Sequence, residues 1–98
     1  MNTLVIDVFP KATAVHCSED VLVVSLADGR SISVPLIWFP RLVAATSSQR
    51  ENFEFIGDGS GIHWPDIDED VSINGLLAGT PSLEYRRAAG QHHVATDN

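Results

Sequence analysis

Cysteine and lysine each occur only once in this sequence, as Cys17 and Lys11. A single cysteine cannot form a disulfide within the chain. Basic residues are few altogether, because 6 of them stand against 13 acidic ones and give a net charge of −7. Direct binding to nucleic acid depends on clustered lysine and arginine side chains that neutralise phosphates. The composition therefore argues against a direct nucleic-acid partner.

Long hydrophobic runs are also absent. No segment approaches the roughly 18 apolar residues of a membrane span. Met1 is followed by a strand-like run instead of the basic residues and apolar core that mark a signal peptide. We therefore expect a cytoplasmic protein with no membrane partner. Hydrophobic residues make up 44% of the 98 residues, which is near the globular average and leaves room for one core.

Alternating apolar and polar residues predict strands in the first third of the chain. The predicted segments are 3–9, 12–17 and a hairpin over 21–34. A two-residue loop in this hairpin would place serines opposite its apolar side chains. A three-residue loop over 27–29, with Gly29 in a left-handed conformation, instead pairs Val24 with Ile32 and Leu22 with Val34. The pattern favours the three-residue loop.

Helical spacing begins after the hairpin. It predicts a helix over 36–46, with Pro40 either restarting or kinking it. Ser48 and Glu51 fit the pattern of a capping box and predict a short helical turn. Ser72 is placed to cap a helix over 73–78 that ends at Gly79. Between these elements, 53–56 and 61–64 are predicted to form a second hairpin around a glycine-rich loop.

Strands followed by a few short helices indicate an α+β fold. We expect a small antiparallel sheet with β-hairpins, packed against two or three short helices. Residues 1–82 are predicted to form a single compact domain. Residues 83–98 are polar and are predicted to form a flexible tail, with a helical turn over 85–89.

The segment 63–70 is the densest polar constellation and holds four of the 13 acidic residues. It has two interpretations. In the first, the segment is a solvated acidic approach to the N-terminus of the helix that follows, where the helix dipole favours negative charge. Alternatively, an exposed Trp64 rimmed by acids forms a binding patch for a partner protein. The candidate partner-binding residues are His63, Trp64, Asp66, Asp68, Glu69 and Asp70.

Metal and nucleophile sites have weaker support. A calcium loop starting at Asp66 fails, because it requires glycine where Val71 stands and glutamate where Leu77 stands. A transition-metal site at His63 would need a distant ligand such as His16. His16 also cannot activate Cys17, because neighbouring residues of a strand point to opposite faces. No cofactor motif occurs, and we expect neither a metal nor a cofactor.

The segment 61–77 combines His-Trp-Pro, a run of acids and the pair Leu76-Leu77. With the Asp28-Gly29 hairpin and the segment 34–42, it resembles a bacterial family, domain of unknown function two-four-four-two, over roughly residues 3–80. The resemblance implies a compact α+β domain without an established activity. It also implies regulatory or binding work, because members resemble companions of small toxin-like proteins in paired operons. Some members carry a helix-turn-helix after this domain, whereas this chain has none.

Three functions follow from these observations. The leading hypothesis is a non-enzymatic, antitoxin-like interaction or regulatory module that binds a partner protein, such as a small toxin-like protein, through the acidic and aromatic surface. The second is an acidic inhibitor that occupies the nucleic-acid-binding channel of an enzyme. The third is a small metal-dependent hydrolase centred on His63. The chain is expected to be a monomer or a homodimer.

Overall fold

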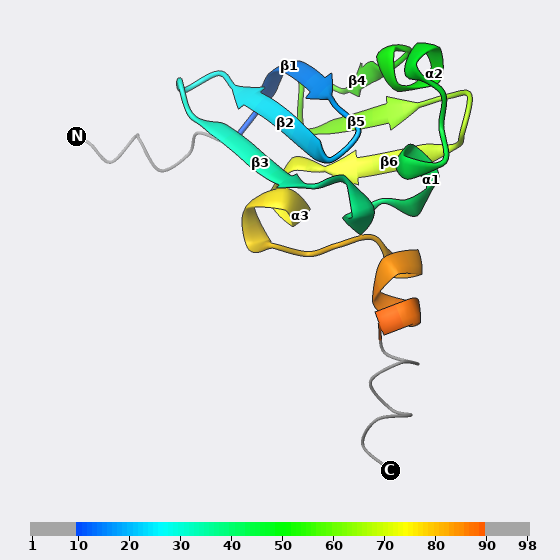
Figure 1. Cartoon of the computed structure of the whole chain (residues 1–98). Helices are drawn as coiled ribbons and strands as arrows, with labels where there is room; N and C mark the ends of the chain where they lie inside the picture. The colour runs from blue at the N-terminus through cyan, green and yellow to red at the C-terminus, as the bar shows by residue number, and fades with distance from the viewer. Residues whose placement is uncertain (1–9, 90–98) are drawn as a thin grey trace, which may run out of the picture.

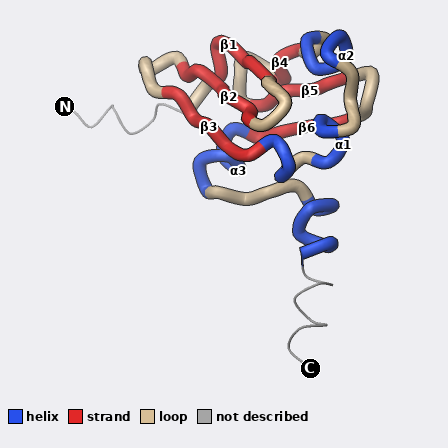
Figure 2. The backbone as a smooth tube through the Cα atoms, in the orientation of Figure 1, coloured by secondary structure: helices blue, strands red, loops and turns tan. Residues whose placement is uncertain are grey.

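The computed structural model describes residues 10–89 and shows an α+β protein with two three-stranded antiparallel sheets (Figure 1). Sheet A consists of β1 (Ala12–Cys17), β2 (Val21–Leu26) and β3 (Ser31–Pro35). Sheet B consists of β4 (Glu54–Ile56), β5 (Gly61–Trp64) and β6 (Glu69–Ser72). Short helices lie around the rim of the strands (Figure 2). The strand predicted over 3–9 lies outside the described residues.

Sheet A has the register that the hairpin pattern predicts. Val24 pairs with Ile32 and Leu22 pairs with Val34. The amide of Leu26 donates to the carbonyl oxygen of Arg30 at 2.8 Å, so the loop has three residues. Gly29 has φ 95°, a left-handed conformation that costs glycine no steric penalty. The predicted three-residue loop is confirmed.

Sheet B contains the second predicted hairpin, β4–β5, and a strand that the sequence reading did not predict. β6 pairs with β5 so that Trp64 lies opposite Glu69. The loop between them runs from Pro65 to Asp68, and Asp68 has φ 52°. The acidic segment is therefore a hairpin loop and a strand. The interpretation of this segment as a solvated acidic approach to a helix is wrong, because part of it is a strand in which Glu69 is buried.

The predicted helix over 36–46 is divided at Phe39. A 3-10 helix, η2 (Leu36–Trp38), is followed by α1 (Pro40–Val43). Phe39 has φ −127°, because the ring of the following proline disfavours the helical conformation in the preceding residue. Pro40 then restarts the chain as the first residue of α1, where its missing N–H leaves no bond unmade. A single continuous helix is thus wrong, and a restart at Pro40 is confirmed.

The next helix, α2 (Ser47–Glu51), has a different cap from the one predicted. Thr46 is the N-cap: its hydroxyl accepts from the amide of Gln49 at 3.1 Å, and the Gln49 side chain accepts from the amide of Thr46 at 2.9 Å. Ser48 lies inside the helix and is not its cap. Assigning the cap to Ser48 was wrong by two residues, whereas the predicted short helical turn is confirmed.

The last elements follow sheet B directly. In α3 (Ile73–Ala78), Ser72 accepts a hydrogen bond from the amide of Gly75, and Gly79 ends the helix with φ 74°, as predicted. Residues 83–89 are helical as well. The amide of Ser82 donates to the carbonyl oxygen of Trp38 at 3.1 Å and fixes the start of this segment. None of the helices in the described part of the chain is long and apolar enough to cross a membrane.

One hydrophobic core receives side chains from the inner faces of both sheets and from the short helices. Trp64 is its largest fully buried side chain. The indole N–H of Trp64 donates to the carbonyl oxygen of Arg50 at 3.0 Å, so its polar group is satisfied inside the core. The other fully buried large side chains are Leu22, Val24, Leu36, Leu42, Ile62 and Ile73.

Candidate functional site

The outer face of sheet B carries a row of charged side chains across its three strands. Glu54 lies opposite His63, and His63 lies opposite Asp70. Side chains alternate between the two faces of a strand, so Ile62 and Trp64 enter the core while His63 points outward. Glu54 and Asp70 are exposed. We call Glu54, His63 and Asp70 the acidic row.

The central contact of the acidic row joins His63 to Asp70. The amide of Ile73 donates to the carbonyl oxygen of Ser60 at 3.0 Å, which makes Ser60–Ile73 a hydrogen-bonded pair. Such pairs alternate along an antiparallel ladder, so His63 and Asp70 form a non-hydrogen-bonded pair, the kind that brings side chains closest. His63 Nδ1 lies 2.5 Å from Asp70 Oδ1.

This contact changes the protonation of His63. The hydrogen bond to Asp70 raises the pKa of His63, desolvation opposes this, and the charges of Asp70, Glu54 and Asp68 raise the pKa further. The imidazole is thus more readily protonated than a free histidine. At lower pH the row gains a positive charge between its two carboxylates.

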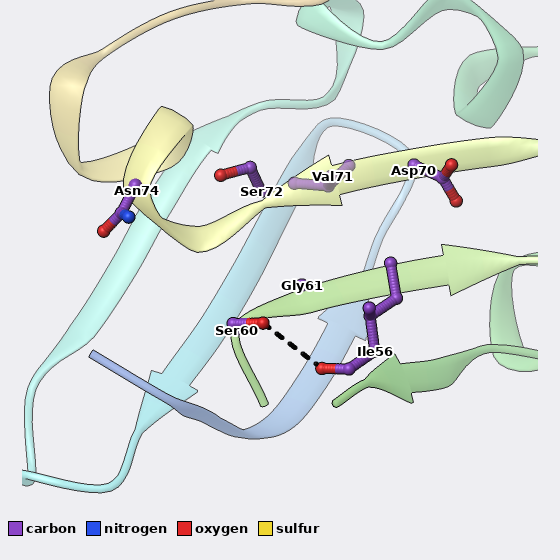
Figure 3. A pocket seen from close by; sticks show the side chains of 7 residues that line it. All are labelled: Ile56, Ser60, Gly61, Asp70, Val71, Ser72 and Asn74. Carbon is purple, nitrogen blue, oxygen red and sulfur yellow. Dashed lines mark hydrogen bonds between the residues drawn. The ribbon is translucent and has the colours of Figure 1, made fainter. Parts of the chain in front are cut away.

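A hollow of about 360 Å³ lies beside the acidic row (Figure 3). Gly61 leaves it open, because a Cβ at this position would lie 3.2 Å from both Ile56 Cδ1 and the Val71 carbonyl oxygen. The Ser60 hydroxyl donates to the carbonyl oxygen of Ile56 at 3.4 Å and ties one wall together. The lining residues are Ile56, Ser60, Gly61, Asp70, Val71, Ser72 and Asn74.

The loop Pro65–Asp68 extends the negative charge beyond the end of sheet B. Asp66 is exposed and accepts a hydrogen bond from Asn52 Nδ2 at 3.0 Å. Asp68 is also exposed, and its carbonyl oxygen accepts from Arg41 Nη1 at 2.7 Å. The hydrogen bond from Arg41 holds the loop by its backbone, so the carboxylates of Asp66 and Asp68 both remain exposed to solvent.

Two of the predicted partner-binding residues do not belong to this surface. Trp64 has an exposed fraction of 0% and Glu69 one of 7%. The prediction of Trp64 as an exposed aromatic anchor is therefore wrong. Trp64 lies two residues after Ile62 in the same strand, so both side chains point to the core. His63, Asp66, Asp68 and Asp70 remain on the outside, and Glu54 joins them.

Sequence reasoning missed Glu54 as a member of the site. It lies nine positions before His63 in the chain, and only the β4–β5 register brings the two together. The signal was present in the predicted second hairpin. Pairing 54 with 63 across its glycine-rich loop would have identified the contact.

The structure does not bring together the residues of the metal site or of the cysteine–histidine pair that the sequence suggested. Within residues 10–89 no three His, Cys, Asp or Glu side chains are grouped so that they can hold a metal ion. His16 lies on β1 in sheet A, not beside His63 in sheet B. Burial raises the pKa of the half-buried Cys17 thiol, and the charge of Arg50 only partly opposes this. The thiol is therefore held in its unreactive protonated form.

Comparisons with known proteins agree with this fold. Residues 12–82 match the model of the family described as protein of unknown function, DUF2442. A crystal structure of a protein of unknown function from Rhodospirillum rubrum is 30% identical, with a TM-score of 0.65, over 76% of this chain and 93% of that one.

A second solved structure extends the comparison. The solution structure of an uncharacterised protein from Chromobacterium violaceum is 27% identical, with a TM-score of 0.66, over 81% of this chain and 75% of that one. Among curated proteins, none matches the sequence.

Proposed function

The chain belongs to the DUF2442 family of proteins of unknown function, and we propose that it is a non-enzymatic module that binds a basic partner protein through the outer face of sheet B. The observation that carries this proposal is the acidic row beside its hollow. Glu54, His63 and Asp70 are held in register by three paired strands. Sites on paired strands are positioned more firmly than sites on loops.

Charge supports a basic partner. The chain has a net charge of −7, and Asp66 and Asp68 add to the carboxylates of the acidic row. Opposite charge on two proteins speeds their encounter and selects against wrong partners. An antitoxin-like role, with a small toxin-like protein as the partner, is one form of this function.

The hollow supports a specific contact in addition to charge. Ile56 is 43% exposed on one side of it, and Gly61 leaves its floor without a side chain. Interfaces gain most of their affinity where one side chain fills a pocket surrounded by polar groups. An aliphatic or aromatic side chain of the partner fits this hollow, with basic groups beside it facing Glu54 and Asp70.

Affinity capture with matched variants tests the proposal. The tagged chain is incubated with nuclease-treated extract of its host, and retained proteins are identified by mass spectrometry. Glu54→Gln combined with Asp70→Asn removes two charges from the acidic row. Glu19→Gln combined with Asp20→Asn removes two charges from exposed residues of the β1–β2 turn and is the control.

The expected result is one basic protein retained in near-stoichiometric amount by the native chain and by the control, and reduced at least tenfold by the acidic-row variant. Equal retention by both double variants would place the interface elsewhere. A folded native chain that retains no protein would contradict partner binding altogether.

A further inference from the structure

A second hollow, of about 370 Å³, lies between β6, α1 and the helix over 83–89. Figure 1 shows this last helix in orange beyond α1, outside both sheets. An ion pair of 3.2 Å between Arg41 Nε and Glu84 Oε1 ties α1 to it. The hollow is lined by Arg41, Glu69, Asp70, Leu83, Glu84 and Arg87.

Glu69 is the unusual member of this lining. It is 7% exposed, yet none of the described residues forms a hydrogen bond or an ion pair with its carboxylate. Burial raises the pKa of Glu69, and the charge of Arg41 only partly counteracts this. Buried carboxylates are normally paired or hydrogen-bonded, because an unpartnered buried charge is costly. Glu69 therefore lacks the cationic donor that its position calls for.

The basic side chains of the lining do not supply that donor. Arg41 donates from Nη1 to the carbonyl oxygen of Asp68 at 2.7 Å and pairs through Nε with Glu84. Arg87 is exposed and forms no ion pair within the described part of the chain. The lining thus holds the carboxylates of Glu69 and Glu84 and two guanidinium groups, and Arg41 is already engaged by Glu84.

We propose that this hollow receives one basic side chain, an ammonium or a guanidinium group, from the partner protein and pairs it with Glu69. This proposal rests on the proposed function and adds to it a second contact with the same partner, at β6 but apart from the acidic row. The volume of the hollow is sufficient for a lysine or arginine side chain. Leu83, which is 51% exposed, offers an apolar wall to the methylene groups of such a side chain.

The contact is tested without the partner, by NMR titration of the full chain with Nα-acetyl-lysine amide and Nα-acetyl-arginine amide at low salt. The Leu83 methyl signals and the Glu69 side-chain carboxyl carbon are followed. At least one probe is expected to shift both sets of signals saturably. Glu69→Gln is expected to weaken this binding at least tenfold.

Two further variants complete the test. Glu51→Gln removes the same charge from an exposed residue at the end of α2, and its affinity for the probe is expected to match that of the native chain. Arg87→Gln removes a competing cation from the lining, and the probe is expected to bind this variant about twofold or more tightly. Its exposed side chain makes the variant independent of core packing.

Three results would overturn the proposal: no saturable shift at Glu69 and Leu83 in the native chain, equal binding by Glu69→Gln, or weaker binding by Arg87→Gln. Its failure is distinct from failure of the proposed function. A chain that captures its partner through the acidic row but binds neither probe refutes the Glu69 contact alone. If the chain binds a probe at Glu69 but captures no partner, the cation-binding site at Glu69 stands and the proposed binding of a partner protein is contradicted.

Discussion

Trp64 anchors the core through both its ring and its N–H group. Its exposed fraction is 0%, its ring lies 6.2 Å from that of Phe53, and its indole N–H is bonded to the Arg50 carbonyl oxygen. A residue that sequence reasoning placed at a binding surface thus joins β5 to the end of α2. Trp64 contributes to the stability of the fold, so its substitution is tested by measuring the free energy of unfolding.

Trp64→Ala is expected to lower the free energy of unfolding by about 3 to 5 kcal/mol, because it leaves a cavity and an unsatisfied carbonyl oxygen. Urea denaturation followed by circular dichroism measures this loss. Ile37→Ala, at a position that is 59% exposed, is the control and is expected to change stability by about 0.5 kcal/mol or less. A similar small change in both variants would contradict the burial of Trp64.

His63 gives the molecule a measurable pH dependence. Because Asp70 raises the pKa of His63 in the folded chain, the protonated imidazole stabilises the fold below the pKa of the unfolded chain. This contribution is lost as the pH rises through the folded pKa. Asp70→Asn is therefore expected to lower the pKa of His63, as followed by NMR of the ring protons.

A second substitution separates this contact from general charge. Asp66→Asn removes the same charge from the neighbouring loop, where Asp66 binds Asn52 and not His63. It is expected to leave the pKa of His63 close to its native value. An equal fall in both variants would show that the hydrogen bond to Asp70 does not dominate.

At the scale of elements, the loop between β4 and β5 joins the two sheets. The amide of Ala12 donates to the carbonyl oxygen of Gly59 at 2.7 Å. Gly59 has φ 112°, and a Cβ there would lie 2.8 Å from the Ala12 carbonyl oxygen. Only glycine fits, because both the conformation and the close approach of the backbone exclude a side chain.

Gly59→Ala is expected to lower the free energy of unfolding by about 2 to 5 kcal/mol, from backbone strain and steric overlap together. Gly29→Ala is the matched control. Gly29 also has a positive φ, of 95°, but no atom lies within 4 Å of the added Cβ. It is expected to cost about 1 kcal/mol, from strain alone. Equal losses in thermal or urea unfolding would contradict the contact between the sheets.

Elements with a clear period were predictable from the sequence, and elements defined by few residues were not. The β2–β3 register followed from pairing apolar faces, and the α3 ends followed from Ser72 and Gly79. By contrast, β6 begins with a buried glutamate, so its alternation has no apolar residue at that position. The strand was therefore not recognisable from the alternation of apolar and polar residues.

The cap of α2 shows a second limit of the sequence. Both Thr46 with Gln49 and Ser48 with Glu51 fit the capping-box spacing. The choice between them depends on where α1 ends, and this in turn depends on Pro40 dividing the preceding segment. The candidate site had the same difficulty, since Glu54 reaches His63 only through strand pairing. Contacts that form only through strand pairing cannot be predicted from a short stretch of sequence.

At the scale of the whole molecule, the two sheets differ in what they present outward. Sheet A places serines on its outer side, at Ser25, Ser31 and Ser33, whereas sheet B places the acidic row there. The shared core determines the outer faces of both sheets, because in each strand the residues between the buried ones must point outward. The acidic row thereby lies on the outer face of sheet B, where a partner of opposite charge is expected to bind.

Hydrogen–deuterium exchange of the chain, alone and with its captured partner, tests this central claim most directly. We expect the partner to slow amide exchange across β4, β5 and β6 and in the loop Pro65–Asp68, while the β2–β3 hairpin exchanges as in the free chain. Protection confined to sheet A, or no protection of sheet B at saturating partner, would contradict the assignment of the acidic row as the binding surface.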